Sequence, residues 1–305
     1  MVGRCEDARG GAMRRILVTG ANKGIGLAIA TAILEEHDDT HVLLGARSAE
    51  RGREAVDNLQ RDHADWRARV ELLELDVASD DSVQRAARSV RERFGREPAP
   101  LYAVVNNAGI GSSDMAATVN VNVLGVRRVC EAFLPLLEPG KGRIVNITSA
   151  AGPNFVNACT PERQLLFVDP AITWPALQAL IAEYLAIEPR KAAFTAKGLG
   201  DGNAYGFSKA CANAYTVLLA REHASLRINA CTPGFIETDM TRHYARSQGK
   251  SPSEMGMKPP AAGARAAMFL VFGEPAGNGR YYGSDAQRSP LDRYRAPGDP
   301  AYAGA

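Results

Sequence analysis

The chain has 305 residues, and 36 Lys and Arg against 34 Asp and Glu leave a formal net charge of +2. Hydrophobic residues make up 46% and charged residues 23%, a composition that excludes disordered, collagen-like and disulfide-scaffold proteins. No dense basic stripe is present, so we expect no nucleic acid partner. No run of about 18 apolar residues occurs, so we expect no membrane-spanning segment.

The cysteines and the N-terminal residues suggest where the protein resides. Five cysteines are scattered without C-x-x-C spacing, which favours free thiols in a reducing compartment and predicts no metal site. Residues 1–13 contain Glu6 and Asp7 where a targeting peptide would avoid acids, and no apolar segment follows them. We therefore expect an irregular tail at 1–13, with Met13 as an alternative start, and a cytoplasmic protein.

The first half of the chain alternates short apolar runs with helical patterns. Strands are expected at 16–19, 41–45, 70–76, 101–106 and 143–147. Helices are expected between them at 27–34, 49–63, 79–94, where Ser79 is the N-cap, and 121–137. This alternation predicts parallel strands joined by right-handed crossovers. The predicted fold class is doubly wound α/β, in which functional residues lie just after the strands.

A helical insertion interrupts this alternation at about 152–202. Within it, Thr173 is expected to cap a helix that has Pro175 in its first turn. The later elements are expected to be a helix at 204–223, a strand at 227–232, a helix at 261–272 and a strand at 280–283. The sequence thus predicts one domain at 14–283, with a substrate loop at about 239–260 and an irregular tail at 284–305.

A glycine-rich turn follows the first expected strand. T-G-A-N-K-G-I-G, residues 19–26, places three glycines directly before an amphipathic helix. Small residues at such a turn let a pyrophosphate approach the backbone, and the helix N-terminus stabilises its charge. A plain tight turn is the alternative interpretation. The position between a strand and a helix favours a dinucleotide site.

The end of the second strand favours NADP over NAD. NAD enzymes usually place an acid there for the ribose hydroxyls, but the strand ends V-L-L-G-A-R and offers Arg47 instead. Lys23 in the glycine turn adds a second cation that is able to pair with a 2′-phosphate. Either residue alone is equally well explained as a solvated surface cation. Together, and with the acid missing, they predict NADPH/NADP+ as the preferred cofactor.

Further motifs follow the other expected strands. They are Asp76-Val77, Asn106-Asn107-Ala108-Gly109, Ser149, Tyr205-x-x-x-Lys209 and Pro233-Gly234. With the glycine turn, this ordered set resembles the short-chain dehydrogenase/reductase family over roughly residues 14–283. The resemblance implies a Rossmann-type sheet and hydride transfer between a nicotinamide and a carbonyl carbon.

Four residues form the expected catalytic set. Tyr205 and Lys209 lie on one helical face, and an adjacent ammonium is expected to lower the pKa of the phenol from about 10. Tyr205 would then protonate the carbonyl oxygen, which Ser149 would also hydrogen-bond. The resemblance implies that Lys209 binds the ribose hydroxyls and that Asn122 positions a water in a proton relay. Asn120 is a rival to Asn122, and packed or capping side chains are the structural alternative.

The resemblance also assigns the cofactor contacts residue by residue. The adenine end, the dinucleotide and the nicotinamide end together involve Gly20, Asn22, Lys23, Gly24, Ile25, Gly26, Arg47, Asp76, Val77, Asn107, Ala108, Gly109, Tyr205, Lys209, Pro233, Gly234, Ile236 and Thr238.

The long spacing between the serine and the tyrosine points to one branch of the family. Most members place the serine about a dozen residues before the tyrosine, whereas Ser149 and Tyr205 are 56 residues apart. An insertion of this size resembles the monomeric NADPH-dependent carbonyl-reductase-like branch, so we expect a monomer. Only 13 residues separate Gly109 from Asn122, which predicts a trimmed loop beside the substrate pocket. Aromatic residues of the insertion are expected to supply pocket walls, namely Phe155, Phe167, Trp174 and Tyr184.

These patterns predict an NADPH-dependent carbonyl reductase that converts a ketone or aldehyde to an alcohol by direct hydride transfer. The expected partner is therefore a small-molecule carbonyl substrate, which the sequence does not identify. One alternative is an NADP(H)-binding regulator or interaction protein without turnover. Another is the same chemistry run as alcohol oxidation.

Overall fold

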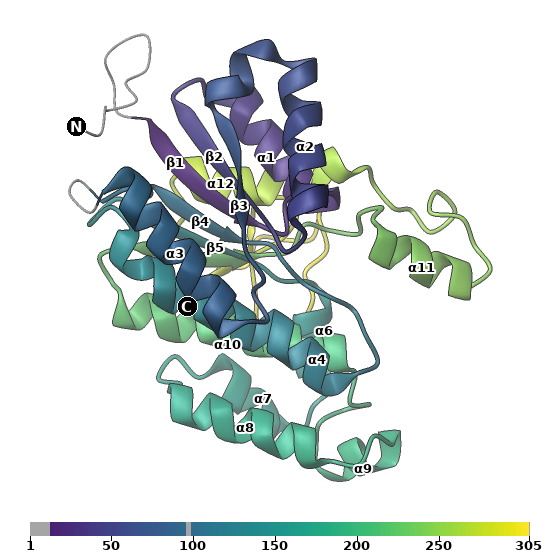
Figure 1. Cartoon of the computed structure of the whole chain (residues 1–305). Helices are drawn as coiled ribbons and strands as arrows, with labels where there is room; N and C mark the ends of the chain where they lie inside the picture. The colour runs from purple at the N-terminus through teal and green to yellow at the C-terminus, as the bar shows by residue number, and fades with distance from the viewer. Residues whose placement is uncertain (1–12, 96–98, 305) are drawn as a thin grey trace.

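The computed structural model describes residues 13–95 and 99–304, and this part of the chain forms an eight-stranded sheet between helical layers (Figure 1). The strand order is β3-β2-β1-β4-β5-β6-β7-β8, and only β7 and β8 pair antiparallel. The predicted doubly wound α/β class is confirmed. The strands are β1 (Arg14–Thr19), β2 (Thr40–Ala46), β3 (Val70–Glu74), β4 (Ala103–Asn106), β5 (Arg143–Ile147), β6 (Arg227–Cys231), β7 (Tyr281–Tyr282) and β8 (Arg288–Ser289).

Two hydrophobic cores lie on the two faces of the sheet. Successive residues of β1 point to opposite faces, so Leu17 lies in one core while Ile16 and Val18 lie in the other. Burial on both faces explains why the strands read as continuous apolar runs. One face carries α1 (Gly24–Glu36), α2 (Ala49–Asp62) and α12 (Arg265–Phe272), and the other carries α3 (Asp80–Phe94), α5 (Val126–Phe133) and α10 (Ala204–Glu222). Shorter helical segments are η1 (Ala64–Ala68), α4 (Met115–Val119), the π-helix η2 (Asn120–Gly125), η3 (Leu134–Leu136) and η4 (Pro260–Gly263).

The insertion forms an additional helical layer outside α10 (Figure 1). Its helices are α6 (Ala151–Asn157), α7 (Pro161–Val168), α8 (Trp174–Ala186) and α9 (Lys191–Ala196). Thr173 caps α8 as expected, because its side chain accepts a hydrogen bond from the Ala176 amide. Tyr184 of α8 stacks on Phe207 of α10 with 3.7 Å between ring centroids. The insertion is therefore packed through aromatic rings onto the helix that carries Tyr205.

Several boundaries differ from the sequence prediction for local reasons. The helix expected from 121 begins at Met115, since the Asp114 carboxylate caps it by accepting from the Ala117 amide at 2.9 Å. In the segment expected to be an irregular tail, β8 adds a short strand to the sheet. A nearly buried ion pair between Arg295 and Asp285, at 2.9 Å, holds that segment in place.

Helix α11 (Asp239–Ser247) replaces the first nine residues of the expected substrate loop. It projects from the body of the protein in Figure 1. Two backbone hydrogen bonds join the ends of the segment that contains α11. The Lys258 amide donates to the Phe235 carbonyl at 2.9 Å, and the Glu237 amide donates to the Lys258 carbonyl at 2.8 Å. Residues 235–258 thus form a helical flap whose two ends are hydrogen-bonded to each other.

Other expectations concern the cysteines and the ends of the chain. Within the described residues the cysteines are buried and free, as expected: Cys130, Cys159, Cys211 and Cys231. Cys5 and the expected tail, apart from Met13, lie outside the described residues. No helix in residues 13–95 and 99–304 has the length and apolar character needed to cross a membrane.

Candidate active site

The glycine turn and the end of β4 are bound to each other. The Thr19 hydroxyl accepts hydrogen bonds from the amides of Asn107 and Ala108, each at 3.0 Å, and the Asn107 side chain donates to the Thr19 carbonyl at 2.9 Å. Gly20 has a φ of +63°, and a Cβ there would lie 2.9 Å from the Ala108 Cα. Thr19, which sequence reasoning missed, therefore joins two of the predicted cofactor motifs.

The turn forms a cradle that side chains would fill. Gly24 has a φ of +58°, and a Cβ on Gly26 would lie 2.4 Å from Asn107 Nδ2 and 2.5 Å from the Gly20 carbonyl oxygen. In the described chain no side chain caps the N-terminus of α1, and its first turn holds no acid. Backbone donors at a helix N-terminus suit a phosphate group. Asn22 lies half-buried within this turn, while Ile25 packs against the core, which leaves its backbone for any cofactor contact.

The two predicted phosphate cations have different environments. Arg47 is exposed directly after β2, and the Ala21 amide donates to the Gly45 carbonyl at 2.9 Å, which holds the glycine turn beside that strand end. Lys23 instead forms an ion pair with Asp239 of α11 at 2.5 Å. The 2′-phosphate contact predicted for Lys23 stays a prediction, and this ion pair adds a competing partner for its ammonium.

Asp76 and Val77 follow β3 at the same edge of the sheet. The Asp76 carboxylate accepts a hydrogen bond from the Ala78 amide at 3.0 Å, which shapes the turn after the strand. Val77 is buried, and a Cβ on Gly125 would lie 3.0 Å from its carbonyl oxygen. Both residues thus lie in the ordered turn after β3, where the sequence predicts the adenine.

The four predicted catalytic residues come from three parts of the chain, and two of them, Asn122 and Lys209, lie beside Gly109. Ser149 follows β5, Tyr205 and Lys209 lie at the start of α10, and Asn122 lies in the π-helix η2. Lys209 Nζ donates to the Ile147 carbonyl at 3.0 Å and lies 5.6 Å from the centroid of the Tyr205 ring. A Cβ on Gly109 would lie 3.2 Å from Asn122 Oδ1 and 3.4 Å from Lys209 Nζ, so this glycine leaves space in front of both groups.

Burial dominates the electrostatics of this cluster. Burial raises the pKa of Tyr205, and a hydrogen bond with Ser149 opposes that rise. Burial also lowers the pKa of Lys209 to about 8. The expected lowering of the Tyr205 pKa by its lysine neighbour is therefore wrong, because desolvation of the phenol outweighs any attraction to the Lys209 ammonium.

Asn122, rather than Asn120, belongs to this cluster. Its Oδ1 accepts from the Ile110 amide and its Nδ2 donates to the Ile110 carbonyl, both at 2.9 Å. Nδ2 also donates to the Ser208 hydroxyl at 3.0 Å, and that hydroxyl donates to the Tyr205 carbonyl at 2.8 Å. Asn120 turns toward the segment after β3. Ser208, which sequence reasoning missed, thus connects Asn122 with α10.

The segment after β6 lies directly over the glycine turn. Gly234 has a φ of +91°, and half-buried Pro233 precedes it. Ile236 is buried, close to both Ile25 and Gly263. Thr238 caps α11, and its Cγ2 lies 3.5 Å from the position of a Cβ on Gly24. The residues predicted for the nicotinamide end therefore flank the phosphate cradle.

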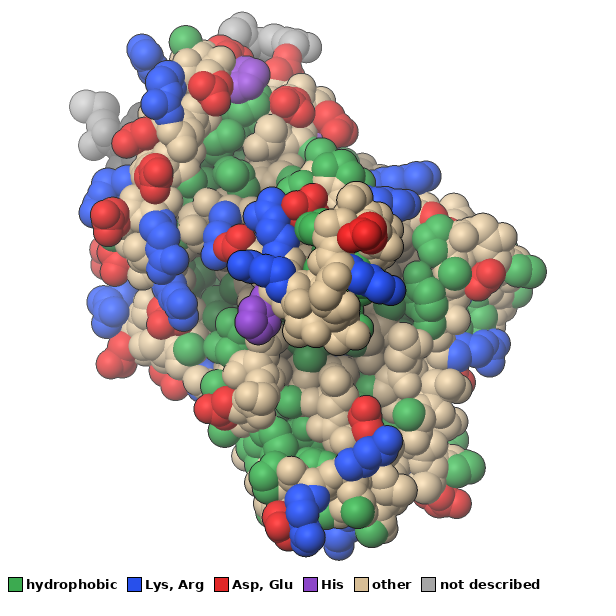
Figure 2. Space-filling model, turned by 90° about the vertical axis from the view of Figure 1, so that its right-hand side faces the viewer, with side chains coloured by type: hydrophobic (Ala, Val, Ile, Leu, Met, Phe, Trp, Pro, Cys, Tyr) green, Lys and Arg blue, Asp and Glu red, His purple; other side chains and the backbone are tan. Residues whose placement is uncertain are grey.

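A cavity of about 570 Å³ opens beside Tyr205. Its walls come from the loop after β4, the insertion and α11: Gly111, Ser112, Ser113, Met115, Pro189, Lys191, Phe194, Asp201, Gly202, Asn203, Ala204, Tyr205 and His243. Figure 2 shows this side of the molecule, with the α11 flap toward the viewer.

The aromatic residues expected to line this pocket do not do so. Phe155, Phe167 and Tyr184 are buried between the insertion and α10, where each ring contacts Phe207. The Arg127 guanidinium lies over the Trp174 ring, with its Cζ 3.8 Å from the ring centroid. The aromatic residue that the insertion contributes to the cavity is Phe194. No periodic pattern in the sequence indicates that position.

Comparisons with known proteins agree with this architecture. The family model described as short chain dehydrogenase matches residues 14–160. Carbonyl reductase [NADPH] 1 of Rattus norvegicus is 32% identical over 278 residues, which cover 86% of this chain and 92% of that protein. Carbonyl reductase [NADPH] 3 of Mus musculus is 34% identical over 262 residues, 81% of this chain and 89% of that protein. Salutaridine reductase from Papaver somniferum shares the fold, with a TM-score of 0.71 at 24% identity, over 88% of this chain and 99% of that one.

Proposed function

The chain belongs to the short chain dehydrogenase family of oxidoreductases, and on that premise we propose that it reduces a ketone or aldehyde to an alcohol with NADPH. The observation that carries the proposal is the clustering of four residues: Asn122 and Lys209 flank Gly109, a hydrogen bond joins Ser149 to Tyr205, and Tyr205 lies on the wall of a cavity of about 570 Å³. The names of the rat and mouse relatives, both carbonyl reductases using NADPH, support the same reaction and cofactor.

The cradle at the N-terminus of α1 fits a dinucleotide. Its glycines leave room that any side chain would fill, and its backbone donors lack side-chain partners within the described chain. In this proposal Gly20, Gly24 and Gly26 hold the pyrophosphate, while Lys23 and Arg47 take the 2′-phosphate. When bound, NADPH supplies the hydride.

Tyr205 acts as the general acid. Reduction adds a proton to the carbonyl oxygen, so the donor must be protonated at neutral pH, and the raised pKa of Tyr205 keeps its phenol in that state. The Tyr205 O–H bond breaks as the new alcohol O–H bond forms. Ser149 hydrogen-bonds the same oxygen and holds it in place.

Lys209 and Asn122 support the proton transfer from behind Tyr205. The Lys209 ammonium stabilises the phenolate that remains after the transfer, and its pKa of about 8 leaves it mostly charged at pH 7. Asn122 holds the Ile110 segment and Ser208 in place beside Lys209. A water held near Asn122 then returns a proton to Tyr205 from solvent by way of Lys209.

The test follows NADPH and NADH oxidation with quinones, aromatic ketones, aldehydes and terpenoid ketones. We expect turnover of at least one carbonyl with NADPH, and a loss of about 10³-fold in Tyr205→Phe, within the range for general acid catalysis. NADPH binding to both proteins, measured by fluorescence, is expected to be equal. NADPH binding without turnover of any carbonyl would instead favour the regulator that binds NADP(H) without catalysis.

We also propose that the protein is a monomer. Helix α8 packs on α10 and α4, so the insertion covers the outer surface of the helix that carries Tyr205. A second copy would have to displace this layer to reach α10. Size-exclusion chromatography with light scattering is expected to give the mass of one chain, and a stable tetramer would contradict the proposal.

A further inference from the structure

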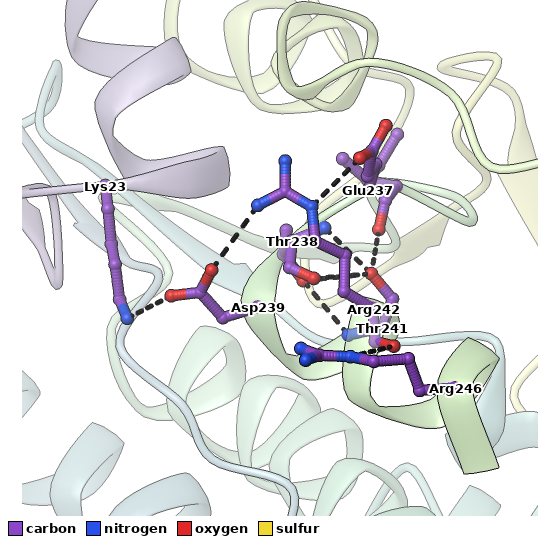
Figure 3. A network of polar contacts seen from close by, with 8 residues as sticks. Lys23, Glu237, Thr238, Asp239, Thr241, Arg242 and Arg246 are labelled. Carbon is purple, nitrogen blue, oxygen red and sulfur yellow. Dashed lines mark hydrogen bonds and ion pairs between the residues drawn. The ribbon is translucent and has the colours of Figure 1, made fainter. Parts of the chain in front are cut away.

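An exposed ion pair connects the phosphate cradle to the α11 flap. Lys23 Nζ lies 2.5 Å from Asp239 Oδ2, and the two side chains are 60% and 63% exposed (Figure 3). Lys23 is the N-cap residue of α1, and Asp239 is the first residue of α11. Exposed pairs of this kind are weak, because water competes for both ions. The contact is therefore easily exchanged.

Asp239 has a second cationic partner, Arg242, within α11 itself. Arg242, one turn further along α11, places Nη1 3.5 Å from the other carboxylate oxygen of Asp239. Its Nε donates to Glu237 at 2.9 Å, which fixes the guanidinium on the flap (Figure 3). Loss of Lys23 would thus leave the Asp239 carboxylate paired, while Lys23 would be free to turn back toward the cradle.

Lys23 has a second anionic partner within its reach in the proposed complex. It belongs to the cradle whose shape and backbone donors fit a dinucleotide, and Thr238, the neighbour of Asp239, lies over Gly24 of that cradle. A doubly charged phosphate forms stronger charge-assisted hydrogen bonds with an ammonium than an exposed carboxylate does. An exchange of Lys23 from carboxylate to phosphate is therefore favourable.

We propose that Asp239 is a cofactor-specificity residue: it holds Lys23 in the free protein, and the 2′-phosphate of NADPH takes Lys23 from it. This inference rests on the proposed use of NADPH. NADH lacks the 2′-phosphate and leaves the Lys23–Asp239 pair intact. Asp239 thereby lowers the affinity for NADPH without lowering that for NADH.

The exchange also reaches the substrate cavity. Met240, the next residue of α11, places its sulfur 3.0 Å from the position of a Cβ on Gly111, and His243 lines the cavity beside Tyr205. The same short helix thus contacts both the cofactor cradle and the substrate wall. Release of Lys23 removes one tether of α11 when NADPH is bound.

The test measures the dissociation constants of NADPH and NADH for wild type and for Asp239→Asn by titration calorimetry. We expect the variant to bind NADPH about three- to fivefold more tightly, the range that an exposed ion pair accounts for, and to bind NADH within twofold of wild type. Glu237→Gln is the matched control, since it removes a carboxylate of the same segment that contacts Arg242 but not Lys23.

A variant that lacks Lys23 distinguishes the proposed exchange of Lys23 from simple charge repulsion between Asp239 and the 2′-phosphate. In Lys23→Gln the further change Asp239→Asn is expected to leave NADPH affinity unchanged, whereas long-range repulsion by Asp239 would persist without Lys23. A gain in that background, an equal gain for NADH, or no gain at all would overturn the exchange. Wild-type protein that binds neither nucleotide would overturn the proposed function itself.

Amide hydrogen exchange gives a readout independent of affinity. Without nucleotide, the amides of α11 are expected to exchange about threefold faster in Asp239→Asn than in wild type, because one tether is missing. With NADPH bound, the two proteins are expected to match, since Lys23 has left Asp239 in both. A difference that persists in the bound state would contradict the proposal.

Discussion

Two polar clusters at the same edge of the sheet are held in opposite ways. The proposed catalytic cluster comprises Asn122, Ser149, Tyr205 and Lys209. Hydrogen bonds to the main chain fix the side chains of Asn122 and Lys209, and burial moves the pKa values of Tyr205 and Lys209. The ion-pair cluster of Lys23, Asp239, Arg242 and Glu237 is exposed and joins two separate segments. Burial fixes groups for proton transfer, whereas exposure lets ions exchange partners.

The largest effect is expected when the proposed catalytic cluster loses Ser149, the proposed hydrogen-bond partner of the carbonyl oxygen. Ser149→Ala removes a donor aimed at the reacting oxygen, and loss of one such donor typically costs about 100-fold or more in kcat. We expect that loss with an unchanged dissociation constant for NADPH, because the proposed partner of Ser149 is the carbonyl oxygen and not the nucleotide. Steady-state kinetics and fluorescence titration measure the two quantities.

Ser112→Ala supplies the control for this comparison. Ser112 lines the same cavity but belongs to the exposed loop after β4, where its hydroxyl accepts from the Asp114 amide. A change in kcat of less than about threefold is expected. Equal losses in the two variants would contradict the proposed role of Ser149, since its hydroxyl would then matter no more than that of a residue of the cavity wall.

The second effect concerns the pH dependence of reduction. Because burial lowers the pKa of Lys209 to about 8, its ammonium is present below that pH and is lost as the pH rises through it. We therefore expect kcat/KM to fall about tenfold between pH 7 and pH 9. Lys209→Met, which is already uncharged, should be slow at every pH and lack the break near 8. A break retained in that variant would assign the titration to another group.

The strands and several helix starts could be predicted from the sequence. The strands are apolar runs because both sheet faces are buried, and Ser79 and Thr173 mark helix starts through side chains that cap them. The catalytic motifs were placed by their order along the chain. The structure brings Asn122, Ser149, Tyr205 and Lys209 together where the parallel strands end, while their roles remain predictions.

Contacts that join distant segments of the chain could not be predicted from the sequence. The partner of Lys23 lies 216 residues away, and nothing local to Lys23 indicates Asp239. Helix α11 begins with a capping box in which Thr241 replaces the usual Glu or Gln, so the familiar signature is missing. The pKa of Tyr205 was mispredicted because sequence spacing reports the lysine neighbour but not the depth of burial.

A smaller effect is expected from the exposed cation after β2. Arg47→Asp removes a positive charge and adds a negative one beside the proposed 2′-phosphate, so the preference for NADPH over NADH should fall several-fold. The measurement is the ratio of kcat/KM for the two nucleotides. Arg51→Asp, which makes the same charge change on the exposed side of α2, should leave the ratio unaltered. An unchanged ratio in Arg47→Asp would leave Lys23 as the selecting cation.

The smallest expected effect is on the free energy of unfolding, which should differ between variants of the two clusters. Asp239→Asn should lower the free energy of unfolding by less than about 1 kcal/mol, because its ion pair with Lys23 is exposed. Asn122→Ala should cost about 1–3 kcal/mol, since it leaves both backbone groups of Ile110 without a side-chain partner. Urea unfolding at pH 7 measures both.

The pH dependence of the Asp239 contribution gives the sign of the effect. The hydrogen bond from Lys23 lowers the pKa of Asp239, so its contribution is present above the ordinary pKa of an aspartate and is lost as the pH falls through the lowered value. The difference between wild type and Asp239→Asn should therefore vanish in acid. A cost at pH 7 as large as that of Asn122→Ala would make the Lys23–Asp239 pair a structural tether, and a tether of that strength would resist exchange with a phosphate.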